Sequence, residues 1–194
     1  MPMNDPLFSR DHSVLVVIDV QEVFLDKLAA EARAPLVGRI RWLMRVAGAL
    51  GIPMVAMAED IEGNGPPVAA VTGTLPEGVG IHDKRFFGLA GQPEILDAIR
   101  ATGRSQAVLV GLETDVCVAQ SALGLQEAGL RVAALSDATG SPGTCHAAGL
   151  CRMRDAGVTI TTVKGIYYEW VRDLGTLARI KPLIGPDLPD GLTL

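Results

Sequence analysis

Short, continuous apolar runs alternate along the chain with longer stretches that carry apolar residues at helical spacing. The first run, Ser13–Ile18, is continuous and rich in Val, as expected of a strand buried on both faces. The predicted strands are Ser13–Ile18, Ile52–Ala58, Gln106–Val110, Leu130–Leu135 and Val158–Val163, and the predicted helices are Pro35–Leu50, Glu94–Thr102, Val116–Glu127 and Gly143–Ala156. A glycine stands within two residues of the end of each helix, where helices commonly stop. Strand–helix–strand alternation with short loops predicts a mainly parallel sheet in a three-layer α/β/α domain.

Length, composition and charge narrow the class of protein. The 194 residues fit a single domain spanning 1–194, and the 48% hydrophobic content is enough for a sizeable core. The net charge is −5 and the 17 Lys and Arg residues are scattered, so we expect no nucleic-acid partner. The apolar run near the start is too short to span a bilayer and follows no charged leader, so we expect no membrane association and a cytoplasmic location.

Ligands of open parallel sheets bind at the carboxyl ends of the strands, and polar residues follow three of the predicted strands. Asp19 follows the first strand, although an Asp in that place is also a common turn residue. Glu59 follows the second, where it either contacts substrate or faces solvent in a turn. The Gly- and Pro-rich region 60–91 that comes next is interpreted as either a long functional loop or an excursion that covers the site.

Cys117 lies at the start of a predicted helix, after the loop that follows the third strand. The free N–H groups and positive dipole end of a helix start favour a thiolate and can hold an oxyanion. A small buried hydrophobic residue is the alternative role for this cysteine. Lys84 stands in a charged cluster that runs into Phe86 and Phe87. It is either a surface lysine or, beside a carboxylate and a thiol, a cation that lowers the pKa of the thiol.

Several segments, in this order and at these spacings, resemble the isochorismatase-like (cysteine hydrolase) superfamily. They are Val17-Ile-Asp-Val-Gln21 with Phe24 beyond it, Lys84 with Phe87, Gly111-Leu-Glu-Thr-Asp-Val-Cys-Val118, and the stretch 128–138. The resemblance covers the chain from the first to the fifth predicted strand. It implies the isochorismatase-like hydrolase fold.

The resemblance also implies a catalytic triad of Asp19, Lys84 and Cys117. Asp19 would take the thiol proton and later deliver it to the leaving amine, while Lys84 would hold Asp19 charged. Cys117 would attack a carbonyl carbon and form a thioester that water hydrolyses. By the same resemblance the Leu112–Glu113 peptide bond is cis, the backbone N–H groups of Glu113 and Cys117 form an oxyanion hole, and Phe24 lines the substrate wall.

The chain departs from the metal-dependent members of that superfamily. It holds three histidines, and none lies in the region after the second strand where nicotinamidases carry theirs. We therefore expect no metal and no cofactor. The leading hypothesis is cleavage of a C–N bond in a small amide or ureido compound. The alternatives are an isochorismatase-type ether hydrolase led by Asp19, with Cys117 as a bystander, and a catalytically silent oligomeric binding protein.

Three further features lie outside the predicted site. Cys145 and Cys151 are expected to pack in the buried face of their helix. Together with Cys117 they give an odd number of cysteines without CxxC spacing, which predicts free thiols. Tyr167, Tyr168 and Trp170 are interpreted as a subunit interface, since the resemblance implies a homo-oligomer, either dimer or tetramer. The proline-containing tail 182–194 is predicted to be an extended arm.

Overall fold

The computed structural model describes residues 5–194. Its centre is a sheet of six strands in the order β3-β2-β1-β4-β5-β6, and every neighbouring pair is parallel. The strands are β1 (Ser13–Ile18), β2 (Met54–Glu59), β3 (Ile81–Lys84), β4 (Gln106–Leu112), β5 (Arg131–Gly140) and β6 (Thr159–Thr161). Every residue of β1 and β4 is buried, because these central strands are covered on both faces.

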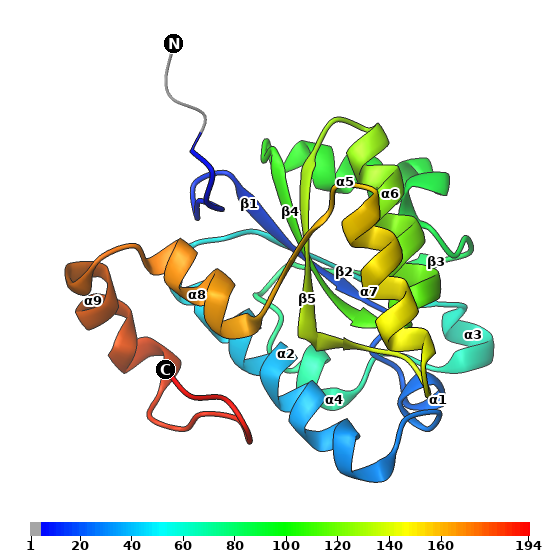
Figure 1. Ribbon diagram of the computed structural model, residues 1–194, viewed down its shortest axis with the longest axis horizontal. Coiled ribbons are helices and arrows are strands. Elements are labelled where there is room, and N and C mark those ends of the chain that lie inside the picture. The colour runs from blue at the N-terminus through cyan, green and yellow to red at the C-terminus, as the bar shows by residue number, and fades with distance from the viewer. Residues whose placement is uncertain (1–4) are drawn as a thin grey trace.

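Helices cover both faces of the sheet, as Figure 1 shows. On one face α2 (Ala30–Leu50), α4 (Ala69–Thr72) and α8 (Val163–Val171) pack, and α9 (Leu174–Ile184) lies against α2. On the other face lie α5 (Pro93–Ala101), α6 (Ala119–Glu127) and α7 (Cys145–Asp155). Alternate residues of β1 divide between the two cores: Val17 packs with Leu43 of α2, and Val16 with Ile95 of α5. The predicted three-layer α/β/α fold is thus confirmed.

The region 60–91 contains regular structure that the sequence pattern did not predict. It holds the single-turn helix α3 (Ile61–Asn64), α4, the edge strand β3 and the 3₁₀ turn η1 (Leu89–Gly91). β3 has the sequence IHDK and three of its four residues are only half-buried. An edge strand needs no continuous apolar run, and this one therefore gives no strand signal. The interpretation of 60–91 as one long loop is wrong for these segments.

Two side-chain predictions away from the site are also wrong. Cys145 and Cys151 are exposed, because α7 turns Gly149 and Met153 toward the core instead. Tyr167 and Trp170 belong to the core of this chain rather than to a subunit interface. The Trp170 indole N–H donates to Ser13 Oγ at 3.0 Å. Tyr168 alone of that cluster is exposed.

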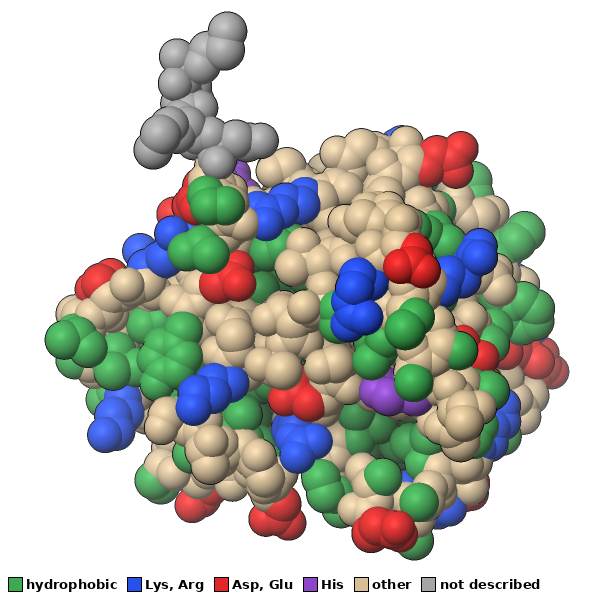
Figure 2. Space-filling view, in the orientation of Figure 1, with side chains coloured by type: hydrophobic (Ala, Val, Ile, Leu, Met, Phe, Trp, Pro, Cys, Tyr) green, Lys and Arg blue, Asp and Glu red, His purple; other side chains and the backbone are tan. Residues whose placement is uncertain are grey.

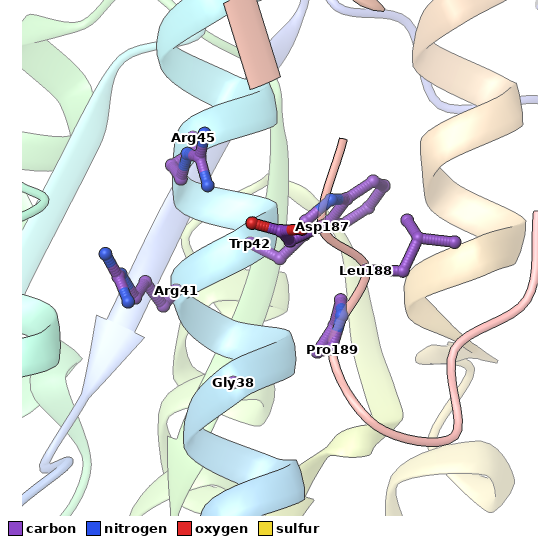
Figure 3. A pocket seen from close by; sticks show the side chains of 7 residues that line it. All are labelled: Gly38, Arg41, Trp42, Arg45, Asp187, Leu188 and Pro189. Atoms are coloured by element: carbon purple, nitrogen blue, oxygen red, sulfur yellow. The ribbon is translucent and has the colours of Figure 1, made fainter. Parts of the chain in front are cut away.

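The C-terminal segment folds back on α2. Pro182 lies inside α9, so the predicted extended arm begins only after that helix ends at Ile184. Leu192 is buried, and a cavity of about 230 Å³ opens between α2 and the segment around Asp187 (Figure 3). Within residues 5–194, no helix combines the length and the apolar character needed to cross a membrane.

Candidate active site

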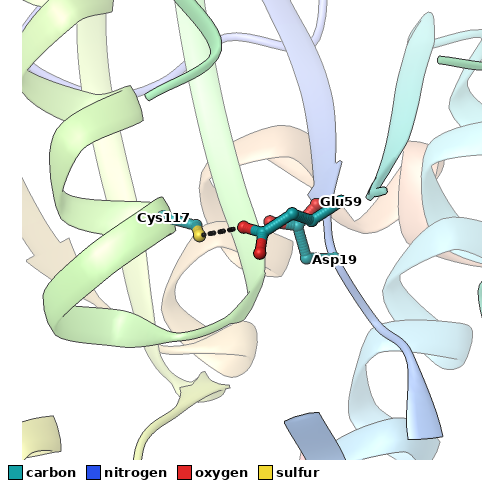
Figure 4. Close-up of side chains that lie close together, drawn as sticks. All are labelled: Asp19, Glu59 and Cys117. Carbon is teal, nitrogen blue, oxygen red and sulfur yellow. Dashed lines mark hydrogen bonds between the residues drawn. The ribbon is translucent and has the colours of Figure 1, made fainter. Parts of the chain in front are cut away.

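Four side chains that sequence reasoning singled out meet at the carboxyl edge of the sheet. Asp19 follows β1, Glu59 ends β2 and Lys84 ends β3. Cys117 lies in the π-helical turn η2 (Thr114–Val118) that follows β4. The parallel register pairs Glu59 directly with Lys84, which sets the carboxylate beside the ammonium. Figure 4 shows Asp19 and Glu59 converging on the thiol from the strand side.

The Lys84 ammonium is the cation at the centre of this group. Its Nζ lies 3.0 Å from Asp19 Oδ2 and 3.3 Å from Glu59 Oε2. It also donates to the backbone carbonyls of Phe86 and Phe87, at 2.8 and 3.3 Å. The side chains of Lys84 and Asp19 are fully buried, and buried charges of this kind persist only when they are paired.

The thiol of Cys117 faces both carboxylates. Its Sγ donates to Glu59 Oε2 at 3.2 Å, and the three ligand atoms of Asp19, Glu59 and Cys117 all lie within 4.8 Å of one another. Cys117 is only 3% exposed. Asp19 Oδ1 has no hydrogen-bond partner in the described part of the chain, so one acceptor atom stays open beside the thiol. The arrangement joins a thiol, two carboxylates and a fixed cation.

Close backbone packing sets the position of the nucleophile turn. Gly111 has a φ of 123°, and a Cβ there would come within 1.8 Å of the Ile18 carbonyl oxygen, so only glycine lets β4 approach β1 at this point. The next peptide bond, Leu112–Glu113, is cis. Beyond it, Ser141 Oγ donates to Asp115 Oδ1 at 2.6 Å, and Thr114 Oγ1 bonds His146 Nδ1 at 2.9 Å. These contacts tie η2 to β5 and α7.

Burial dominates the protonation of the site. It raises the pKa of Asp19 to about 6, against the opposing attraction of Lys84. It also raises the pKa of the Cys117 thiol, and the negative charge of Asp19 raises it further. Lys84 lowers the thiol pKa, as expected from the sequence, but does not outweigh the other two effects. The resting side chain of Cys117 is therefore a thiol rather than a thiolate.

The ammonium of Lys84 stays protonated. Burial alone would lower its pKa, yet the negative charge of Asp19 and its hydrogen bond to the ammonium, together with the charge of Glu59, raise it above the ordinary value. Asp19, Glu59 and Cys117 also offer the donor atoms of a metal site. A divalent ion in that place would have to displace the ammonium, which already lies within 3.3 Å of both carboxylates. The donor set includes no histidine.

The remaining predicted residues flank this group. Phe24 is buried on the short helix α1 (Glu22–Leu25), and the ammonium of Lys27 lies 4.7 Å from its ring centre. Lys27 in turn pairs with Glu113 at 3.0 Å, so Phe24 stands on the side of the predicted oxyanion loop. Sequence reasoning gave no role to one residue that holds the Glu59 backbone. Gln21 is fully buried. Its side-chain oxygen accepts from the backbone N–H of Glu59 at 2.8 Å, and its side-chain nitrogen donates to the Glu59 carbonyl at 2.9 Å.

Comparison with known proteins identifies the family of this chain. A parallel α/β/α fold with a thiol and charged side chains at its carboxyl edge fits a hydrolase, and residues 13–165 match the Isochorismatase domain family. The chain belongs to this family, which is part of a hydrolase superfamily. It is 28% identical to isochorismatase domain-containing protein 2 of Danio rerio over 94% of this chain and 91% of that protein. It is 30% identical to the secreted isochorismatase effector Isc1 of Phytophthora sojae, over 84% of this chain and 79% of that one.

Solved structures agree on the fold. MAR1 ribonuclease from Caenorhabditis elegans superposes with a TM-score of 0.83 at 27% identity, covering 97% of this chain and 98% of that one. The YcaC gene product of Escherichia coli, described as an octameric hydrolase of unknown specificity, superposes with the same score at 23% identity. This superposition covers 93% of this chain and 90% of the YcaC chain. These two solved structures thus bear different functional names on one fold.

Proposed function

We propose that the protein is a cysteine hydrolase that cleaves the C–N bond of a small amide or ureido compound through a thioester at Cys117. The observation that carries the proposal is the thiol packed against two carboxylates that share one buried ammonium. A carboxylate beside a thiol can take its proton, and a fixed cation keeps that carboxylate charged. No cofactor takes part in this chemistry.

In the proposed reaction Cys117 Sγ bonds to the carbonyl carbon of the substrate while its proton passes to Asp19. The backbone N–H groups of Glu113 and Cys117 stabilise the oxyanion, and Phe24 lines the substrate wall. The C–N bond then breaks, and Asp19 returns the proton to the leaving nitrogen. Water attacks the thioester and gives one proton to Asp19. The C–S bond breaks, and that proton restores the thiol.

Replacement of the nucleophile tests the proposal. Cys117→Ala should abolish turnover of any amide that the native enzyme hydrolyses, with an unchanged circular dichroism spectrum. Cys145→Ala is the matched control, because it removes an exposed thiol that makes no contact with the charged side chains named above and should retain full activity. Mass spectrometry of the native protein with a panel of amides should reveal an acyl adduct on Cys117. Full activity of Cys117→Ala would refute the mechanism and favour ether hydrolysis led by Asp19.

The substrate, the assembly and the compartment complete the proposal. We propose a homo-oligomer, dimer or tetramer, consistent in kind with the octameric neighbour. We propose no RNA substrate despite the ribonuclease neighbour, because a chain of net charge −5 repels a polyanion. A labelled RNA should therefore survive incubation with the native enzyme. A reduced thiol nucleophile suits the cytoplasm, which we propose as the compartment, although one relative is named as secreted.

A further inference from the structure

Glu59 is the carboxylate that stands between solvent and the nucleophile. Its Oε2 lies 3.2 Å from Cys117 Sγ, so an acidic oxygen borders the place where a substrate carbonyl must sit. The Glu59 side chain is 18% exposed, whereas the side chain of Asp19 is fully buried. A molecule that reaches the thiol from solvent therefore meets Glu59 before Asp19.

The position of Glu59 is fixed by its neighbours. Gln21 binds both its backbone N–H and its carbonyl, and Asn64 Nδ2 donates to the same carbonyl at 3.1 Å. The ammonium of Lys84 holds Oε2. None of these contacts involves Glu59 Oε1. A carboxylate held in this way keeps its charge directed into the site instead of turning away into water.

The cations around the site are already neutralised by acidic partners. Lys27 pairs with Glu113 at 3.0 Å. Arg85 pairs with Asp60 at 2.6 Å and with Asp83 at 2.7 Å. Lys84, which faces the thiol, is shared by two carboxylates. The field at the thiol therefore disfavours a negatively charged group and favours N–H donors or a positive charge.

We propose that Glu59 determines specificity: its carboxylate accepts an N–H group of the substrate next to the scissile carbonyl and rejects substrates that are negatively charged there. The substrate class is accordingly a neutral or cationic small amide or ureido compound. This inference rests on the proposed cysteine hydrolase activity. It also sets the site apart from one built for a carboxylate-bearing substrate such as isochorismate, which would require an unpaired cation.

Two alkylating reagents test this selectivity at the thiol itself. Iodoacetamide and iodoacetate share the same electrophilic carbon and leaving iodide, and differ in bearing a neutral amide or a carboxylate. With either reagent the sulfur bonds to that carbon, iodide leaves with the electron pair, and the thiol proton goes to solvent. The rate at each cysteine is followed by peptide mass spectrometry. Exposed Cys145 and Cys151 report the ratio of the two rates on the same chain, and N-acetylcysteine reports it in free solution.

We expect the iodoacetamide-to-iodoacetate rate ratio at Cys117 to exceed the reference ratio by at least about tenfold, the effect of a close like charge after screening. Glu59→Gln keeps the size of the side chain and removes its charge, so the ratio should fall toward the reference value. Any change in overall thiol reactivity cancels in the ratio. Glu62→Gln is the matched control, because it removes a neighbouring exposed charge and should leave the ratio unchanged.

The selectivity of the native protein is measurable whether or not Glu59→Gln folds, and added salt should reduce it. An equal ratio at all three cysteines would overturn the inference. So would an equal effect of Glu62→Gln, or failure of both reagents to reach Cys117. Alkylation requires no turnover. Failure of the cysteine hydrolase proposal is recognised separately, by retained turnover in Cys117→Ala.

Discussion

Replacing Lys84 with Met should destabilise the protein in a pH-dependent way. Methionine nearly preserves the length and volume of lysine but leaves Asp19 and Glu59 without their shared cation. At an effective dielectric constant of about 20, the Lys84–Asp19 attraction over 3.0 Å is worth about 5–6 kcal/mol. That full amount cannot appear as lost stability, because Asp19 can take up a proton instead.

Proton uptake by Asp19 limits the loss of stability in Lys84→Met and makes that loss depend on pH. In the native protein the pKa of Asp19 is raised to about 6, so its carboxyl is ionised above that pH. Because the pKa of Asp19 is higher in the folded than in the unfolded protein, Asp19 lowers the stability of the native protein as pH rises. Loss of Lys84 raises the pKa of Asp19 further. Holding Asp19 neutral costs about 1.4 kcal/mol for each pH unit above its native pKa, so the added loss is about 3 kcal/mol at about pH 8. Below about pH 6 this contribution vanishes.

Urea unfolding at fixed protein concentration, followed by circular dichroism from about pH 5.5 to about pH 8, measures the difference between native protein and Lys84→Met. The loss of the bonds to the carbonyls of Phe86 and Phe87 adds a constant of about 1 kcal/mol each at every pH. Between Asp19→Asn and Asp19→Asn/Lys84→Met the part due to Asp19 should be absent, since neither protein has an ionisable group at position 19. A stability difference between the native protein and Lys84→Met that does not change over this range would refute the electrostatic reasoning.

Two other consequences follow from the same site. The proposed base must be ionised, so kcat/KM should rise with pH through about 6, the pKa of Asp19, and Asp19→Asn should remove this activity; a flat profile across that range would exclude Asp19 as the base. Gly149→Ala should lower kcat by at least about tenfold, because its Cβ would meet the Asp115 Cα at 2.7 Å and force η2 to move. Gly80→Ala, where a Cβ meets open space, is the control, and equal kcat in the two variants would show that α7 does not position the nucleophile.

The buried centre of the fold could be predicted from the sequence, while its edge could not. β1 and β4 are buried along their whole length and mostly apolar because helices cover both their faces, and the sequence pattern predicts these strands directly. β3 carries His82, Asp83 and Lys84 at the sheet edge, where tertiary pairing rather than apolar pattern makes the strand. The two exposed cysteines were misplaced for a related reason. Apolar character alone does not say which side of α7 faces the core.

The candidate site divides in the same way. Asp19, Glu59 and Cys117 follow strands that are visible in the sequence, so their common edge was predictable. Which of these side chains contact one another was not predictable, since the Glu59–Lys84 pair depends on the register of β2 with β3. That register sets Glu59 against Lys84, and the turn that follows β4 brings the Cys117 thiol to Glu59 Oε2. The net rise in the thiol pKa was missed as well, because burial depends on how completely the helices close over the site.

The fold fixes the charged groups more firmly than the nucleophile. Asp19, Glu59 and Lys84 stand at the ends of three hydrogen-bonded neighbouring strands, so their mutual distances follow from the sheet. Cys117 instead sits on a π-helical turn, where it is held through its neighbours by Ser141 and His146. Because the resting thiol is protonated, a small movement of this turn changes its alignment with the carboxylates without altering their charge. Contacts that hold η2 should therefore govern reactivity, while the strand ends govern the protonation of the site.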